Sequence, residues 1–341
     1  EAEKIPDWET ASVMPSMMEW EGGIFEFSRE AAADLIPSLN GIGLTHKVNG
    51  MFSFTPDGMP LLGESPNVRG FWMAEAIWIT HAGGAGKAVA EWIADGNPSS
   101  DLRECDISRF HPYATTPSYV RTRSSQQYRE VYDIIHPQQQ MESPRNIRIA
   151  PYHERFIELD AEFFENAGWE RPQWFGVNEK LLEDRPAGPD RNGWAKRYWS
   201  TIIGAEHRAT RETVALFDLT PFTKLEITGK GALNYLQHLT SNNMEKPEGR
   251  ITYTSMLNHR GRVKCDLTVT RIASNKFLVV TGGSTGVIDL QWMKRNVINH
   301  GEVQLTDISS KWCCVGVWGP NARALVSKTT DSDLSNNAFP Y

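Results

Sequence analysis

Residues 250–281, RITYTSMLNHRGRVKCDLTVTRIASNKFLVVT, decide the fold class of this chain. Three runs of β-branched and apolar residues are separated by turns that contain Gly or Asn, which is typical of consecutive strands. The predicted strands are 250–258, 262–272 and 277–281. His259-Arg260-Gly261-Arg262 is the predicted turn of one hairpin. Helical periods at 231–239 and 289–299 flank these strands, so the sequence predicts an α+β arrangement.

Outward from this stretch, the chain continues as a mixture of short strands and helices. Residues 224–228 (KLEIT) alternate like a half-buried strand, and 312–318 (WCCVGVW) form an apolar strand. The N-terminal hundred residues end in a predicted strand over 68–79, a small-residue loop and a helix over 88–94. Between these halves the chain is polar and aromatic, and a helix is predicted over 153–167.

The composition excludes several classes of partner. The 341 residues are 40% hydrophobic and 23% charged, which is enough for a sizeable core and about two domains. The net charge of −7 argues against a nucleic-acid or anionic-membrane surface, because neutralising phosphates requires a basic excess. No apolar run approaches the roughly 18 residues of a membrane span. We therefore expect neither nucleic acid nor membrane as a partner.

The two ends of the chain do not look like natural termini. Glu1 is not preceded by an initiator Met or a signal peptide, and residues 337–341 follow directly on a helix-and-turn pattern. We expect a fragment of a longer protein that is not secreted. No GxGxxG follows a predicted strand, so these residues alone do not predict a complete dinucleotide fold.

Asp266 is the sharpest candidate for chemistry, because it lies within Val263–Val269 (VKCDLTV), a segment with the pattern of a buried strand. Aspartate is depleted in strands and costly beside core residues unless it has partners. Such a carboxyl group can have a raised pKa and can hold or move a proton. The alternative places Asp266 at the solvent-facing position of an edge strand. Tyr253, on the preceding strand, is expected to lie beside it and to offer a ring to a flat ligand.

A second candidate is the small-residue loop at 80–87 (THAGGAGK). Glycines let the backbone approach a ligand closely, and a helix that begins there directs free N–H groups at it. The loop is therefore a candidate site for an anion or a polarised carbonyl. The alternative is a tight turn whose glycines only let the helix pack on the strand. His81 precedes the glycines, and a lone histidine is more often structural than a ligand contact.

Other motifs are less specific. Residues 52–63 (FSFTPDGMPLLG) place a Pro-Asp-Gly turn between two apolar runs, which predicts a hairpin. The sequence contains no HExxH and no clustered carboxylates, so no metal site is predicted. It also contains no GxSxG, so seryl chemistry is not predicted.

Taken in chain order, these residues resemble the dimethylglycine and sarcosine dehydrogenase family. These flavoproteins join a D-amino-acid-oxidase (DAO)-type FAD domain to an aminomethyltransferase-like folate-binding domain. The resemblance extends over nearly the whole chain. The motifs that carry it are 48–50 (VNG), 55–64 (TPDGMPLLGE), 83–87 (GGAGK), 106–111 (DISRFH), 168–172 (GWERP), 216–220 (LFDLT), 253–258 (YTSMLN) and 265–267 (CDL).

The resemblance implies an α+β chain of two domains. It places the C-terminal part of a DAO-type FAD-dependent oxidoreductase domain at 1–105 and a central connector of that oxidoreductase at 106–175. It places the N-terminal part of an aminomethyltransferase-like (GcvT-like), folate-binding domain at 176–341. FAD and tetrahydrofolate are the cofactors that it implies.

The resemblance also assigns roles to residues. In such folds the last helix of the FAD domain begins beside the flavin, where its start can stabilise negative charge on the reduced ring. The implied flavin neighbours are Gly83, Gly84, Gly86 and Lys87, with Thr55, Asp57 and Gly58 as weaker candidates. In the folate domain, Asp266 is implied to handle a proton beside tetrahydrofolate. Tyr253 and Thr268 are implied to line the pocket.

The implied reaction is oxidation of an N-methyl amine to an iminium by FAD, followed by capture of the one-carbon unit on tetrahydrofolate. The electron acceptor is expected to be an electron-transfer flavoprotein or oxygen. The expected compartment is the mitochondrial matrix for an animal protein and the cytoplasm otherwise. Residues 77–81 are bulkier than the family pattern, which leaves the choice of amine open. The first FAD-binding segment and the later half of the folate domain are absent, so we expect these residues alone to be inactive. A non-catalytic relative, like the regulatory subunit of pyruvate dehydrogenase phosphatase, is the alternative.

Overall fold

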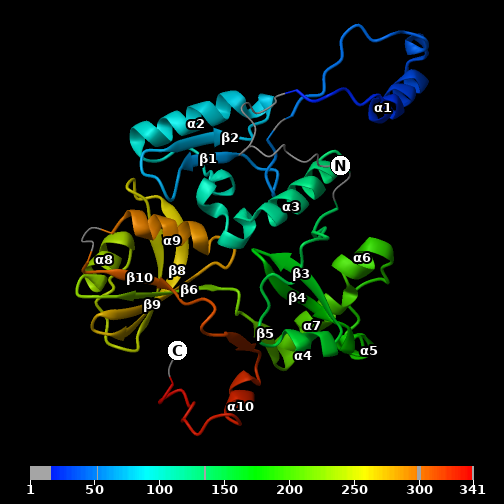
Figure 1. The fold of residues 1–341 in the computed structure, drawn as a ribbon. Helices are drawn as coiled ribbons and strands as arrows, with labels where there is room; N and C mark the ends of the chain where they lie inside the picture. Colours follow the sequence, from blue (N-terminus) through cyan, green and yellow to red (C-terminus); the bar gives the residue numbers. More distant parts are fainter. Residues whose placement is uncertain (1–16, 52, 134–135, 298–300, 340–341) are drawn as a thin grey trace.

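In this computed structural model, residues 17–51, 53–133, 136–297 and 301–339 are described. Some residues named in the sequence analysis lie outside the described residues: Glu1, Tyr341, Phe52 of the predicted turn segment and 298–299 of the predicted helix. Figure 1 shows three neighbouring parts. We call them the N-terminal unit (17–130), the hairpin unit (141–212) and the sheet unit (223–308).

The sheet unit contains a five-stranded antiparallel sheet with strand order β10-β6-β9-β8-β7. Its strands are β6 (Thr223–Thr228), β7 (Ile251–Leu257), β8 (Val263–Ala273), β9 (Lys276–Thr281) and β10 (Gln304–Asp307). Helices α8 (Ala232–Leu239) and α9 (Gly286–Arg295) pack on one face of this sheet. The three predicted strands and the two helices beside them are confirmed, and so is the α+β class.

The core of the sheet unit follows from the two-residue period of its strands. Alternate residues point toward α8 and α9, and on the central strands they are apolar. Those that are at most 2% exposed are Leu225, Ile227, Leu267, Val269, Phe277 and Val279. The residues between them face the opposite side of the sheet, which α8 and α9 do not cover. Each central strand therefore contributes to the core with one face and to an open surface with the other.

The hairpin unit is built on β3 (Ala161–Asn166) and β4 (Trp169–Phe175), which pair antiparallel. The prediction of one helix over 153–167 is wrong, because only α4 (His153–Glu158) is helical. Asp160 has a φ of 56° and Ala167 a φ of 51°, so the backbone turns before and after β3. Such positive φ values interrupt a right-handed helix. The other helices of this unit are α5 (Leu181–Asp184), α6 (Gly193–Tyr198) and α7 (Thr201–Glu212).

In the N-terminal unit the predicted strand over 68–79 is mostly wrong. Only β2 (Trp72–Glu75) is extended, because Gly70 (φ 81°) and Ala76 (φ 54°) turn the backbone on either side of it. The turn predicted within 52–63 forms, but it does not join a hairpin. Instead, β1 (Leu61–Glu64), which follows the turn, pairs with β2.

The remaining elements of the N-terminal unit are α1 (Gly22–Leu35), α2 (Ala82–Asp95), α3 (Pro117–Glu130) and the short 3-10 helices η1 (Pro37–Leu39), η2 (Ile79–His81), η3 (Arg103–Cys105), η4 (Ile107–Arg109) and η5 (Pro112–Thr115). The hairpin unit also contains η6 (Gly176–Asn178). Three of the described elements lie outside the three units: β5 (Ala215–Asp218), β11 (Val315–Trp318) and α10 (Ala322–Val326). Strand β5 pairs with β11 beside the sheet unit. Among the described residues, no helix is long and apolar enough to span a membrane.

Candidate functional site

Tyr253 and Asp266 lie side by side on β7 and β8. The hydroxyl of Tyr253 donates a hydrogen bond to Oδ2 of Asp266 over 2.9 Å. Thr268 stands directly opposite Tyr253 in the register of the two strands. By the alternation of the strands, all three side chains belong to the face that α8 and α9 leave open. The structure therefore brings together the three residues that the sequence assigned to the folate pocket.

The structure corrects one interpretation of Asp266 and agrees in part with the other. Asp266 is exposed, so it is not a carboxylate enclosed by the core. It faces solvent as the alternative expects, but β8 as a whole is not an edge strand, because it pairs with β7 and, from Thr268 onward, with β9. Asp266 precedes this second pairing and has its strand neighbour on β7, and the register buries Cys265 and Leu267 on either side of it.

The electrostatics of this pair follow from the hydrogen bond between the two side chains. Tyr253 is 66% exposed, and its hydrogen bond to the Asp266 carboxylate raises the pKa of the phenol. The pair thus keeps its proton on the phenol and presents a carboxylate as acceptor. Strands hold side chains more precisely than loops do, so the donor, the acceptor and the ring have fixed relative positions. This arrangement can bind a flat polar ring and hold or move a proton at its edge.

The glycine motif is not a loop, which corrects the second prediction. Gly83, Gly84 and Gly86 lie within the first turns of α2, and no side chain caps the start of this helix. A Cβ placed on any of the three would meet no atom within 4 Å in the described structure. Internal packing therefore does not require glycine at these positions, although each costs about 1 kcal/mol relative to alanine in a helix. Lys87 is exposed, and its Nζ lies 3.8 Å from Oε1 of Glu91.

The third set of predicted residues forms a tight turn. Thr55 Oγ1 donates to the carbonyl of Met59 over 2.7 Å, and Gly58 has a φ of 72°, which favours glycine. Asp57 receives two hydrogen bonds from Arg109, over 2.7 and 2.8 Å. Arg109 also donates to the carbonyl of Met59 over 3.0 Å. The turn is thus fixed to η4 by a bidentate ion pair.

Sequence reasoning did not find Arg109 as a partner of Asp57, because 52 positions separate the two residues. It also treated the turn between β7 and β8 only as a turn. In the structure, Arg260 pairs with Asp95 over 2.9 Å, and Arg262 donates to the carbonyl of Ser99 over 3.3 Å. These contacts join the sheet unit to the end of α2. The signal was the pair of arginines in His259-Arg260-Gly261-Arg262.

The fold and these sites define a chain with two joined parts, an oxidoreductase segment and an aminomethyltransferase-type domain. Residues 95–150 match the FAD dependent oxidoreductase central domain, and residues 152–341 match the GCVT N-terminal domain. Because the second match covers more than half of the chain, the chain belongs to the GCVT N-terminal domain family. The domain boundaries expected from the sequence, after 105 and after 175, stay a prediction.

Individual relatives agree with this assignment. The chain is 31% identical over 315 residues to mitochondrial dimethylglycine dehydrogenase of Mus musculus, covering 92% of this chain and 35% of the relative. It is 32% identical over 362 residues to mitochondrial sarcosine dehydrogenase of Homo sapiens, covering 95% and 39%. It is 33% identical over 343 residues to 4-methylaminobutanoate oxidase (formaldehyde-forming) of Paenarthrobacter nicotinovorans, covering 99% and 40%. The resemblance to the dimethylglycine and sarcosine dehydrogenases is confirmed.

A further relative is named for a regulatory role and not for an oxidoreductase activity. The mitochondrial regulatory subunit of pyruvate dehydrogenase phosphatase of Mus musculus is 29% identical over 311 residues, covering 89% of this chain and 35% of that protein. The chain thus spans between 35% and 40% of the length of the four relatives described here.

Proposed function

We propose that this chain is part of an FAD-dependent oxidoreductase that oxidises an N-methyl amine of the dimethylglycine or sarcosine type and passes the one-carbon unit to tetrahydrofolate. The observation that carries the proposal is the Tyr253–Asp266 pair, 2.9 Å apart on the open face of the sheet, in a member of the GCVT N-terminal domain family. The matched oxidoreductase segment and the names of the amine-oxidising relatives support the flavin part.

On the folate side, the residues present fit a flat, hydrogen-bonding ring system. The ring of Tyr253 offers a surface for stacking, and the exposed Asp266 offers a carboxylate that accepts a proton or an N–H bond. The phenol of Tyr253 bonds Oδ2 of Asp266, which leaves Oδ1 of that carboxylate for a ligand. Thr268, beside them, adds a hydroxyl that can donate or accept.

On the flavin side, the start of α2 fits a ring that gains negative charge on reduction. Gly83 and Gly84 bring uncapped backbone N–H groups to an exposed surface without side chains in the way. The helix dipole adds positive potential at the same place. When bound, FAD would accept the hydride from the amine and tetrahydrofolate would capture the one-carbon unit. The glycines that internal packing does not require are then explained by contact with the flavin.

The other parts of this proposal follow from the class of reaction. The amine is the small-molecule partner, and the electron acceptor is an electron-transfer flavoprotein or oxygen. Three of the relatives carry the word mitochondrial in their names. For an animal protein we propose the mitochondrial matrix as the compartment, and otherwise the cytoplasm.

The first experiment records the visible spectrum of the complete natural polypeptide before and after anaerobic addition of dimethylglycine or sarcosine. We expect a flavin band that one of these amines bleaches, because hydride transfer reduces the flavin. A colourless protein that binds no added FAD would contradict the oxidoreductase proposal. A bound flavin that N-methyl amines of this type leave oxidised would contradict the proposed substrate class.

The same experiment tests the alternative that the protein is a regulatory subunit. The relative of pyruvate dehydrogenase phosphatase covers nearly the same part of this chain, so the overall fold is compatible with a binding role. Absence of flavin together with saturable binding to a phosphatase catalytic subunit is the result that favours it. Bleaching of a bound flavin by an amine rules it out.

The folate step is tested by Asp266→Asn in the complete polypeptide, with Ser255→Ala as the matched control. Ser255 pairs with Asp266 in the register and shares the open face. We expect Asp266→Asn to shift the product from the tetrahydrofolate adduct to free formaldehyde by roughly a hundredfold or more, the lower end of the usual range for a general acid or base. Flavin bleaching should be unchanged in both variants. Unaltered product partition in Asp266→Asn would leave the folate domain as scaffold only.

A further inference from the structure

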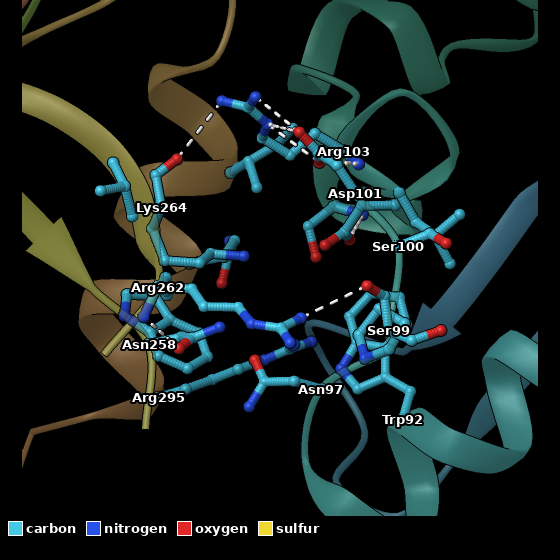
Figure 2. A pocket seen from close by; sticks show the side chains of 18 residues that line it. Trp92, Asn97, Ser99, Ser100, Asp101, Arg103, Asn258, Arg262, Lys264 and Arg295 are labelled. Atoms are coloured by element: carbon cyan, nitrogen blue, oxygen red, sulfur yellow. Dashed lines mark hydrogen bonds and ion pairs between the residues drawn. The ribbon is translucent and has the colours of Figure 1, made fainter. Parts of the chain in front are cut away.

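A cavity of about 160 Å³ lies between the N-terminal unit and the sheet unit (Figure 2). One wall is the chain from the end of α2 to η4, over residues 97–108. The other wall is the start of β8 with the turn before it, together with α9. Neither Asp266 nor the glycines of α2 line this cavity, so it is separate from both proposed cofactor sites.

Four cationic side chains line the cavity in a chain whose net charge is −7. They are Arg103, Arg262, Lys264 and Arg295. Arg262 reaches across from the sheet unit to the carbonyl of Ser99, and Arg295 donates to the carbonyl of Glu64 over 2.7 Å (Figure 2 shows the first contact). A local positive surface on an acidic protein is a site where an anion is concentrated.

Two carboxylates also line the cavity. Asp101 accepts hydrogen bonds from the side chain of Arg103, the shortest over 2.6 Å, which neutralises that arginine. Asp106 accepts from the backbone N–H of Ser108 over 2.8 Å, which leaves its charge in place, so four cations face two carboxylates in this lining. Behind the wall, Asp289 accepts from Thr281 over 2.6 Å, and burial raises the pKa of Asp289.

Three cations therefore remain without a carboxylate partner. Arg262 and Arg295 have the carbonyl contacts described above, and Lys264 lies over the ring of Trp292, with its Nζ 5.0 Å from the ring centre. Within the part of the chain that the structure describes, none of the three forms an ion pair. Carbonyl contacts satisfy N–H groups but do not neutralise charge.

Unpartnered polar groups in the same cavity provide a second, independent observation. Asn97 is 6% exposed and Ser108 is 4% exposed, and both line the cavity. Among the described residues, Nδ2 of Asn97, Oγ of Ser108 and Nε1 of Trp292 have no hydrogen-bond partner. Buried polar groups are nearly always paired, so these atoms are candidate donors to a molecule or a water held at this wall. All three atoms can donate a hydrogen bond, as an oxyanion requires.

We propose that this cavity binds a small oxyanion, a phosphate or carboxylate group, that bridges the N-terminal unit and the sheet unit. Arg262, Lys264 and Arg295 supply the charge from the sheet unit, and Asn97 and Ser108 supply neutral donors from the opposite wall. A volume of about 160 Å³ has room for one such group with a few waters. This proposal does not depend on the chemistry proposed for the flavin or the folate.

The test titrates the complete polypeptide with inorganic phosphate, and separately with succinate, in a calorimeter at constant ionic strength set with chloride. We expect one saturable site for at least one of the two anions. Tighter binding of phosphate assigns a phosphate group to the cavity, and tighter binding of succinate assigns a carboxylate. The variants Lys264→Gln and Arg262→Gln should each raise the dissociation constant about tenfold, a loss of about 1.4 kcal/mol of binding free energy.

Lys230→Gln is the matched control. It removes an exposed lysine that follows β6, near the end of β8, whereas the cavity lies at the start of β8. Binding should be unchanged in this variant. Far-ultraviolet circular dichroism checks that each variant folds, and Arg295→Gln replaces any variant that does not. Two results would overturn the proposal: chloride binding as tightly as the oxyanions, or oxyanion binding that is unchanged when Lys264 and Arg262 are replaced. Either result is independent of whether the protein oxidises amines.

Discussion

The sheet unit and the N-terminal unit are held together by different interactions. In the sheet unit, apolar side chains from β6 to β9 and from α8 and α9 form one buried cluster, in which Leu225, Phe277 and Met293 are 0% exposed. In the N-terminal unit the buried apolar residues are mostly alanines, with Leu62 as the largest before the connector. Several of its large apolar side chains are more than half exposed: Ile24, Phe27, Phe71 and Ile79.

This contrast indicates where each unit derives its stability. Apolar burial contributes about 25 cal/mol per Å², so the sheet unit has a strong source of stability of its own. The N-terminal unit depends more on specific polar links, such as Asp57 with Arg109, and on contacts with its neighbours. We therefore expect the N-terminal unit to open at lower free energy than the sheet unit. The following experiments test this difference.

The largest effect is expected for Phe277→Ala in the centre of the sheet unit. This side chain is fully buried in β9, so its removal leaves a cavity and should lower the free energy of unfolding by about 3–5 kcal/mol. Phe71→Ala is the matched control in the N-terminal unit, where the ring is 55% exposed, and it should cost less than about 1 kcal/mol. Urea unfolding followed by circular dichroism measures both. Equal losses would mean that the two units do not differ as described.

An intermediate effect is expected for Arg109→Gln, which breaks the link that fixes the turn around Asp57. The Arg109 side chain is 8% exposed and makes two hydrogen bonds to the carboxylate, so the loss should be about 1–3 kcal/mol. Arg129→Gln is the control, because its ion pair with Glu142 is long and exposed and should contribute less than about 1 kcal/mol.

Hydrogen exchange is the measurement that separates these two arginine variants. Faster exchange in Arg109→Gln should be confined to residues around 55–64 and η4, while the amides of β8 and β9 keep their protection. If exchange in the sheet rises equally, the ion pair supports the whole molecule and not the N-terminal unit.

The smallest effect on stability is expected at the Tyr253–Asp266 pair. At neutral pH, Tyr253→Phe and Asp266→Asn should each leave the free energy of unfolding nearly unchanged, since both side chains are exposed. The hydrogen bond to the carboxylate raises the pKa of Tyr253 above its usual value of about 10. Any stabilisation from this pair is therefore present below pH 10 or so and is lost as the pH rises through the raised pKa.

Ultraviolet difference absorbance checks this last prediction. The difference between the natural protein and Tyr253→Phe reports the titration of this one phenol. In Asp266→Asn the phenol should titrate at lower pH than in the natural protein. An unchanged titration would show that the hydrogen bond between the two side chains is not formed in solution.

Local patterns predicted the sheet unit well and the N-terminal unit poorly. The alternation of 250–281 predicted the strands, because the apolar side chains that indicate a strand are the same ones that fill the core. The helix expected over 153–167 was wrong, since pairing with β4 and turns at Asp160 and Ala167 outweigh the apolar spacing. The glycines of 83–86 suggested a loop, yet they begin a helix whose position depends on neighbours that a short window does not include.

The candidate site was predicted in part for the same reason. Tyr253, Asp266 and Thr268 lie on adjacent strands of one hairpin, so their proximity follows from the turn between them. The link between Asp57 and Arg109 joins residues 52 positions apart, and spacing alone does not reveal it. The cationic cavity was not predicted either, because residues on its two walls, such as Ser99 and Arg262, are 163 positions apart.

The alternation of β8 also has a consequence for how such proteins evolve. Cys265 and Leu267 face the core while Asp266 and Thr268 face outward, so a mutation at an outward position leaves the neighbouring packing intact. Selection can then change or discard the chemistry of this surface without first having to rebuild the fold. Relatives named as dehydrogenases and as a regulatory subunit both match this chain, as such freedom at the outward positions would allow.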